Sequence, residues 1–166
     1  MQTFLPLKSF VKSMECLDQK RLGKQRVEAG QILEILCPEI SVFKENTHFD
    51  RKFHAWEHHP AVQMWKGHEE WLKLYLACAV GEWRYRGYIN NILGPSYETE
   101  KQEAPWWLGY EPFHLSHRSN LLRKFPTHYR QFWPEDLDTL QYLWPTQIEG
   151  LREVEPENSI QETANV

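Results

Sequence analysis

The sequence predicts a compact all-α domain with long irregular loops, and three observations lead to this prediction. The chain has 166 residues, a length typical of one domain. Hydrophobic residues make up 41% and charged residues 25%, which indicates a globular rather than a disordered chain. Apolar residues recur with the period of a helix in two long segments, and the alternating pattern of strands is nearly absent.

The first long helix is expected between about Met14 and Leu36, and Pro38 ends it. Gly23 weakens its first half, so we expect the helix to bend or to begin there. Its apolar face is formed by residues at helical spacing: Leu22, Ala29, Ile32, Leu33 and Leu36.

The second long helix is expected to start near Pro60, which suits a first turn, and to end near Gly87. This helix is predicted to build the core, because a continuous apolar stripe runs along it. The stripe consists of Val62, Trp65, Leu72, Tyr75, Leu76, Ala79, Val80 and Trp83.

A shorter helix is expected from Ser116, as its N-cap, to Phe125, with Pro126 as its stop. Residues 38–59 and 90–112 lack helical periodicity and are predicted to be loops. From Glu149 onward the composition turns polar. We therefore expect a helical domain at residues 1–148 and an acidic, disordered tail at 149–166.

The distribution of charge favours a nucleic-acid partner, although the net charge is −4. The tail alone holds five acidic residues and one basic residue, so the rest of the chain has 18 of each and is neutral. Six Lys or Arg lie between Lys8 and Arg26, against two acids. A second basic segment, from His114 to Arg130, contains no acid. Two basic segments on a neutral body are compatible with DNA binding.

The first helix carries a candidate catalytic carboxylate. Arg21, Gln25 and Glu28 are spaced so that they share one face, which borders the apolar face. Glu28 is therefore expected at the edge of the core, with Lys24 and Arg21 beside it. The alternative is a surface helix in which these residues form ion pairs, each of little energetic value.

The second basic segment carries candidate phosphate contacts. Cations, hydroxyls and an amide at the start of a helix are groups that often bind phosphate. The alternative is a helix with a solvated basic face. Aromatic residues beside this segment also suit base stacking, namely Trp106, Trp107, His128, Tyr129 and Trp133. The phosphate candidates are His114, His117, Arg118, Ser119, Asn120, Arg123 and Lys124.

No motif indicates a metal or another cofactor. The histidines fit no closed zinc pattern and no cysteine pair accompanies them. The three cysteines are widely spaced and odd in number, which does not suggest a disulfide scaffold. No apolar stretch is long enough to span a bilayer and no signal peptide is evident, so a cytoplasmic monomer is expected.

Three blocks of the sequence resemble the pyrimidine-dimer DNA glycosylases of the phage endonuclease V type, in the bacterial and phage branch that begins MQTFLP. They are the N-terminus through Leu33, with LDQKRLGKQRVEA at its centre, the segment from His59 to Gly87, and FHLSHRSNLLRKFPTHY at 113–129. The resemblance implies a helical, metal-free glycosylase with an associated AP lyase activity. It also implies that such an enzyme displaces a nucleotide from double-stranded DNA.

The resemblance further implies the roles of individual residues. A free α-amine attacks the sugar C1′ and forms a Schiff base, and Glu28 corresponds to the family's catalytic glutamate. Arg21 and Arg26 would hold phosphates around the lesion, with Lys24 and Gln25 beside them, and residues 114–130 would bind the flanking backbone, with Tyr129 among them.

The N-terminus differs from that of the phage enzyme, in which Met removal exposes a threonine. Here Gln2 follows Met1, and a side chain of that size hinders Met removal. The amine would then belong to Met1, and Thr3 would be an internal residue of the matching type. Without an amine, Glu28 would still suit the activation of water. Two other functions stay open: a non-catalytic DNA-binding domain, and an enzyme that acts on an unusual phage-type base.

Overall fold

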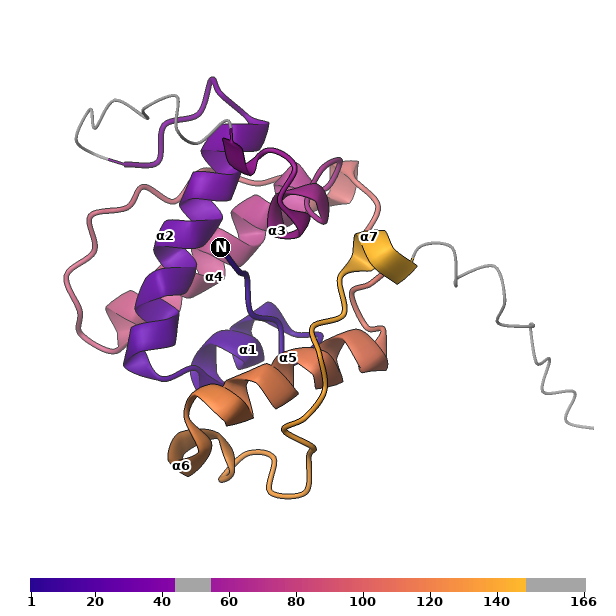
Figure 1. The fold of residues 1–166 in the computed structure, drawn as a ribbon. Helices are drawn as coiled ribbons and strands as arrows, with labels where there is room; N and C mark the ends of the chain where they lie inside the picture. Colours follow the sequence, from indigo (N-terminus) through magenta and orange to yellow (C-terminus); the bar gives the residue numbers. More distant parts are fainter. Residues whose placement is uncertain (44–54, 149–166) are drawn as a thin grey trace, which may run out of the picture.

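The computed structural model describes residues 1–43 and 55–148, and it confirms the prediction of a helical fold (Figure 1). Within these residues there is no strand, but an isolated antiparallel bridge joins Phe43 and Ile92. The predicted tail at 149–166 lies outside the described residues. The elements are α1 (Phe10–Cys16), α2 (Gln19–Leu36), α3 (Pro60–Gln63), α4 (Glu69–Tyr85), the 3-10 helix η2 (Thr99–Lys101), α5 (Glu111–Lys124), α6 (Pro126–Tyr129) and α7 (Pro145–Ile148).

The first predicted helix is in fact two, because the chain turns at Leu17 and Asp18 between α1 and α2. The Asp18 carboxylate accepts hydrogen bonds from the backbone N–H groups of Lys20 and Arg21, so it is the N-cap of α2. The Tyr129 hydroxyl donates to the same carboxylate over 2.6 Å. Helical periodicity alone did not reveal this break. The N-cap role of Asp18 can be recognised only once the start of α2 at Gln19 is known.

The other two predicted helices also have different bounds. The segment expected from Pro60 to Gly87 divides into α3 and α4, and Gly67 lies between them with a positive φ of 83°. The third helix starts at Glu111, so Ser116 lies inside α5 and is not an N-cap. The Ser116 hydroxyl instead donates to the Phe113 carbonyl and accepts from the backbone N–H of Leu143.

The core accounts for much of the aromatic content of the chain. Helix α2 packs against α4, and Figure 1 shows α1 and α5 below this pair. Phe10, Trp65 and Tyr75 form one cluster, with ring centroids 5.5 to 6.3 Å apart. Trp107 extends the cluster at 5.0 Å from Trp65, in an edge-on geometry that aromatic pairs favour. None of the described helices is both long and apolar enough to cross a membrane.

The N-terminal segment runs in an extended path beside α2 towards α1 and α5 (Figure 1). Its backbone groups bond to side chains instead of a neighbouring strand. The Phe4 N–H donates to Gln25 Oε1 over 2.6 Å, and the Phe4 carbonyl accepts from the Tyr75 hydroxyl over 2.9 Å. Buried backbone groups need such partners, since an unpaired one costs the free energy of a hydrogen bond. Helices α2 and α4 thus hold this segment from one side.

Helix α5 holds the same segment with two histidines. The Leu5 N–H donates to His117 Nδ1 over 3.1 Å, and His114 Nδ1 lies 2.7 Å from the Leu5 carbonyl oxygen. His114 Nε2 accepts from the Gly109 N–H, so the His114 proton is on Nδ1. Both rings are neutral, because burial lowers the pKa of His114 and lowers that of His117 to about 3.

The depressed pKa of His117 predicts a loss of stability in acid. Below pH 6.5, its ordinary pKa, His117 takes up a proton in the unfolded chain but not in the native one. The free energy of unfolding should therefore fall as the pH drops from about 6.5 towards about 3, by up to ~1.4 kcal/mol per pH unit from this group. Urea unfolding between pH 7 and pH 4.5 measures the slope.

The matched variant is His117→Asn, whose amide oxygen keeps an acceptor for the Leu5 N–H and does not titrate. Its pH dependence should be shallower than that of the wild type, even where its stability at pH 7 is lower. Equal slopes for the two proteins would contradict the assignment.

Candidate active site

A cleft of about 450 Å³ lies where the N-terminal segment meets α2. It brings together the chain's first residue, the predicted catalytic carboxylate and several cations, which are far apart in sequence. The cleft is lined by Met1, Gln2, Phe4, Lys20, Arg21, Lys24, Gln25, Glu28, His59, Lys124, Tyr142 and Trp144.

Glu28 is bound directly to the N-terminal segment. The backbone nitrogen of Gln2 donates to Glu28 Oε2 over 2.8 Å. Glu28 is half-buried on α2. Met1, which precedes Gln2 in the chain, lines the same cleft. The sequence prediction placed Glu28 at the edge of the core, which the structure confirms. A carboxylate and an α-amine in one cleft can exchange a proton and attack an electrophilic carbon.

The cleft also has cations that are not neutralised. Lys20, Lys24 and Lys124 are exposed, and none of them forms an ion pair with another described residue. Lys24 therefore does not pair with Glu28. Arg21 bonds to the Asp18 carboxylate at 3.3 Å and donates to the Lys124 carbonyl over 3.2 Å. Free ammonium groups around a cleft attract phosphate.

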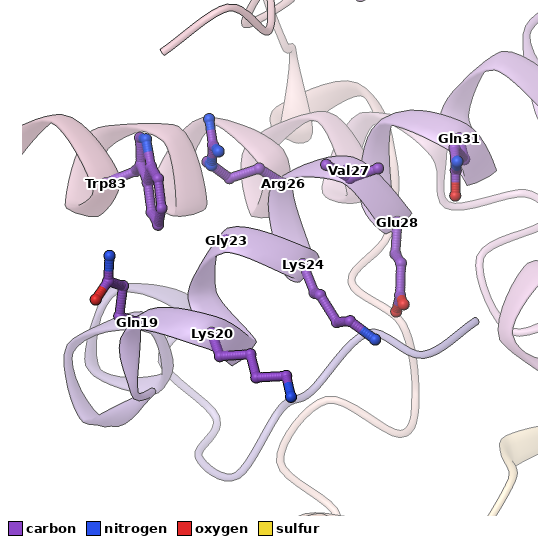
Figure 2. A pocket seen from close by; sticks show the side chains of 9 residues that line it. All are labelled: Gln19, Lys20, Gly23, Lys24, Arg26, Val27, Glu28, Gln31 and Trp83. Carbon is purple, nitrogen blue, oxygen red and sulfur yellow. The ribbon is translucent and has the colours of Figure 1, made fainter. Parts of the chain in front are cut away.

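A second hollow, of about 570 Å³, lies along α2 beside Trp83 (Figure 2). Figure 2 shows Lys20, Lys24 and Glu28 on one side of α2, and Arg26 with Trp83 on the other. The Arg26 guanidinium lies 4.0 Å from the centre of the Trp83 ring and donates to Asn90 Oδ1 over 2.5 Å. Arg26 is 6% exposed and does not line the first cleft, whereas Arg21 does.

Thr3 lies in the core and not in the cleft. Its side chain is fully buried, and its hydroxyl accepts a hydrogen bond from Trp65 Nε1 over 3.0 Å. The expected part of Thr3 in catalysis is therefore given no support by its place, because its hydroxyl is enclosed, has a structural partner and does not line the cleft. Gln25 is 1% exposed, and its side-chain oxygen accepts the hydrogen bond from the Phe4 N–H.

Most of the predicted phosphate contacts on α5 are buried in this structure, and Arg123 and Lys124 at the end of the helix are exposed. His114, His117 and Arg118 hold the N-terminal segment, and the last donates to the Pro6 carbonyl over 3.0 Å. Ser119, Asn120 and Arg123 form bonds at the other end of the helix: Arg123 donates to the carbonyls of Asp138 and Leu140 and to Asn120, and the Ser119 hydroxyl accepts from the Leu140 N–H.

Of these α5 candidates, Lys124 lines the cleft. The others bond within the protein, because a helix packed on both sides must satisfy its own polar groups. Two of the aromatic residues expected to stack on bases are also enclosed: Trp107 is 1% exposed and Tyr129 is fully buried.

Sequence reasoning did not select six residues of the cleft: Gln2, Phe4, Lys20, His59, Tyr142 and Trp144. Lys20 had a usable signal, since it precedes Lys24 by one helical turn. Tyr142 and Trp144 had none, because their place depends on how residues 138–143 return over α5. His59 precedes Pro60, and this position before a helix-starting proline is that of an N-cap.

The described residues offer no group of three His, Cys, Asp or Glu side chains arranged to bind a metal. The three cysteines are free thiols, and none of them lines the cleft. Burial raises the pKa of Cys16 to about 12, which keeps that thiol protonated and unreactive. The groups suited to chemistry in the cleft are thus the amine, the carboxylate and His59.

The model of the pyrimidine dimer DNA glycosylase family matches residues 1–93, more than half of the chain. The matched residues include the N-terminal segment and the whole of α2 with Glu28. No curated protein matches the chain, and no solved structure does. The chain belongs to the pyrimidine dimer DNA glycosylase family, and is accordingly a DNA repair glycosylase whose substrate is DNA with damaged pyrimidines.

Proposed function

We propose that the protein excises pyrimidine dimers from duplex DNA as a glycosylase with an associated AP lyase activity, through an N-terminal amine and Glu28. The observation that supports this most directly is the 2.8 Å bond between the Gln2 nitrogen and Glu28 Oε2. It places the start of the chain against a half-buried carboxylate in a cleft lined by cations.

In this mechanism the neutral amine attacks the sugar C1′ as the bond from C1′ to the pyrimidine nitrogen breaks. The bonding electrons leave with the base, and Glu28 takes a proton from the amine. Glu28 passes this proton to the ring oxygen O4′ as the bond from C1′ to O4′ breaks, which opens the sugar ring and gives a Schiff base. Loss of a proton from C2′ and departure of the 3′ phosphate then break the strand by β-elimination. Glu28 suits these proton transfers, because it contacts the Gln2 nitrogen and lines the same cleft as Met1.

Two nitrogens are candidates for the nucleophile. The α-amine of Met1 is one, and it lies in the cleft with Glu28. The nitrogen of Gln2 would become a primary amine if Met1 were removed, and it is already in contact with the carboxylate. The intact mass of the purified protein shows which of the two is present.

The DNA backbone is held by Lys20, Lys24 and Lys124, because these ammonium groups are exposed at the cleft and unpaired among the described residues. Arg21 is partly committed to Asp18 and contributes less free charge. The main phosphate contacts are thus proposed on α2 and at the last residue of α5, and not along the rest of α5.

Replacement of Glu28 should abolish turnover while preserving the fold. In Glu28→Gln the amide oxygen still accepts from the Gln2 N–H, but the side chain no longer takes up protons. Base release from a dimer-containing duplex should fall on the order of 10²–10⁴-fold. It is measured as cleavage of the bond from C1′ to the pyrimidine nitrogen, because the dimer keeps the freed base joined to its neighbour. Glu34→Gln is the matched control, because Glu34 also lies on α2 and accepts a backbone N–H, that of Val42 over 2.8 Å, outside the cleft. Equal activity of the Glu28 variant and the control would refute the role.

Borohydride should trap a covalent complex with DNA, because it reduces the Schiff base to a stable amine. Peptide mapping should place the crosslink on residue 1 or 2, in agreement with the intact mass. A preparation with an acetylated α-amine is the control and should give no complex. A crosslink on Lys20 or Lys24 would contradict the N-terminal mechanism, and base release without any crosslink would indicate attack by water.

Removal of one cleft cation should weaken DNA binding and its salt dependence together. For Lys24→Ala, the slope of log K against log salt should become shallower by about 0.9, the value for one phosphate contact. Lys66→Ala is the control, because Lys66 is exposed but does not line the cleft. Fluorescence anisotropy on undamaged duplex at several salt concentrations gives both slopes. Equal slopes for the two variants would exclude a phosphate contact at Lys24.

A further inference from the structure

His59 is a cleft residue whose role the mechanism above leaves open. It directly precedes α3, and its Nδ1 accepts a hydrogen bond from the Ala61 N–H over 3.1 Å. The N-cap bond therefore fixes the tautomer: an Nδ1 that accepts leaves the ring proton on Nε2. Nε2 makes no hydrogen bond to the part of the chain that the structure describes.

Two indole rings restrict the orientation of the imidazole. The Trp56 ring lies 5.2 Å away in a tilted geometry, and the Trp144 ring lies 5.9 Å away, edge-on. Trp144 lines the cleft together with His59, Met1 and Glu28. His59 thus combines a fixed ring, an unused N–H and a place in the same cleft as the amine and the carboxylate.

The surroundings favour the neutral ring. Burial and the nearby N-terminal amine lower the pKa of His59. Use of Nε2 as a general base would require the proton to be on Nδ1, which would break the N-cap bond to Ala61. The geometry consequently suits a neutral hydrogen-bond donor and not a proton acceptor.

A glycosylase needs such a donor on the leaving side of the reaction. When the bond from C1′ to the pyrimidine nitrogen breaks, its electron pair spreads over the ring nitrogen and the adjacent carbonyl oxygen. The proton released by the attacking amine goes to Glu28, so that residue serves the opposite side of C1′. The cleft lysines are exposed and suit phosphates. The His59 ring is instead half-buried in contact with two indole rings, and a hydrogen bond to a developing anion is stronger in such surroundings than in water.

We propose that His59 is a further catalytic residue, which donates a hydrogen bond from Nε2–H to the carbonyl oxygen of the departing pyrimidine. This role rests on the proposed glycosylase activity and deepens it. The histidine keeps its proton throughout, and the released pyrimidine anion takes a proton from water. His59 therefore accelerates base release but has no part in cleavage at a site that has already lost its base.

Two variants separate the two nitrogens of the ring. In His59→Asn the side-chain oxygen lies where Nδ1 was, so the cap on α3 is kept and the Nε2 donor is lost. In His59→Gln the longer amide reaches the position of Nε2 and retains a donor, while the cap is weakened. Single-turnover base release from a dimer-containing duplex is compared with strand cleavage of a duplex that carries a preformed abasic site. Thermal unfolding shows that both variants are folded.

We expect His59→Asn to slow base release on the order of 10²-fold, as for the loss of one donor to a developing anion. Cleavage of the abasic duplex should change less than about threefold, and His59→Gln should release base faster than His59→Asn. Equal slowing of both reactions in His59→Asn, or no slowing of either, would overturn the assignment while the wild-type activity stands. A wild-type protein that cleaves no glycosidic bond in the dimer duplex would instead overturn the proposed function, and this inference with it.

Discussion

The backbone of the N-terminal segment is buried without a partner strand, and this constraint shapes the rest of the structure. Its N–H and C=O groups must be bonded, since burial of an unpaired backbone group costs as much as several favourable contacts supply. Side chains from three helices make these bonds: Gln25 of α2, Tyr75 of α4, and His114 with His117 of α5. The same bonds fix where the chain starts, and so place the Gln2 nitrogen against Glu28. The hydrogen bonds that hold the N-terminal segment in the core therefore also form the cleft.

This constraint also explains why α5 is polar and buried at the same time. Its histidines face a backbone and not solvent, and burial keeps them neutral. Arg118 carries a charge into the same region, where it bonds to the Pro6 carbonyl and pairs with Glu111 and Asp136 at 2.5 Å each. A buried cation needs such partners, because desolvation of an unpaired charge is costly. The buried polar residues of α5 thus connect the N-terminal segment to residues 136–143, whereas Lys124 at the end of the helix is exposed.

Helix α2 combines the structural and the chemical tasks. Asp18 caps the start of α2 and accepts a hydrogen bond from Tyr129. Glu28, Lys20 and Lys24 lie on one side of the helix, and the two lysines are exposed (Figure 2). Arg26 lies on the opposite side against Trp83, where stacking and a bond to Asn90 occupy it. Cations close in sequence therefore differ in their surroundings, because the direction in which each points from the helix axis decides whether it meets solvent or protein.

The sequence by itself determined the helical class, the two principal helical regions and the position of Glu28 at the edge of the core, because helical periodicity and spacing are local properties that need no knowledge of the fold. It did not reveal the break at Asp18, because apolar periodicity does not mark where one helix ends and the next begins, nor did it reveal the bond from Tyr129 that holds the capping carboxylate. Nor did it distinguish the phosphate-binding candidates of α2 from the inward polar groups of α5, which have similar composition. Only the tertiary structure showed which of these side chains bond within the protein and which are exposed at the cleft, as it showed the place of His59 in the cleft. The physical reason is the same in both cases: whether a polar side chain is free for a ligand depends on the partner that the fold brings to it, and sequence does not specify that partner locally.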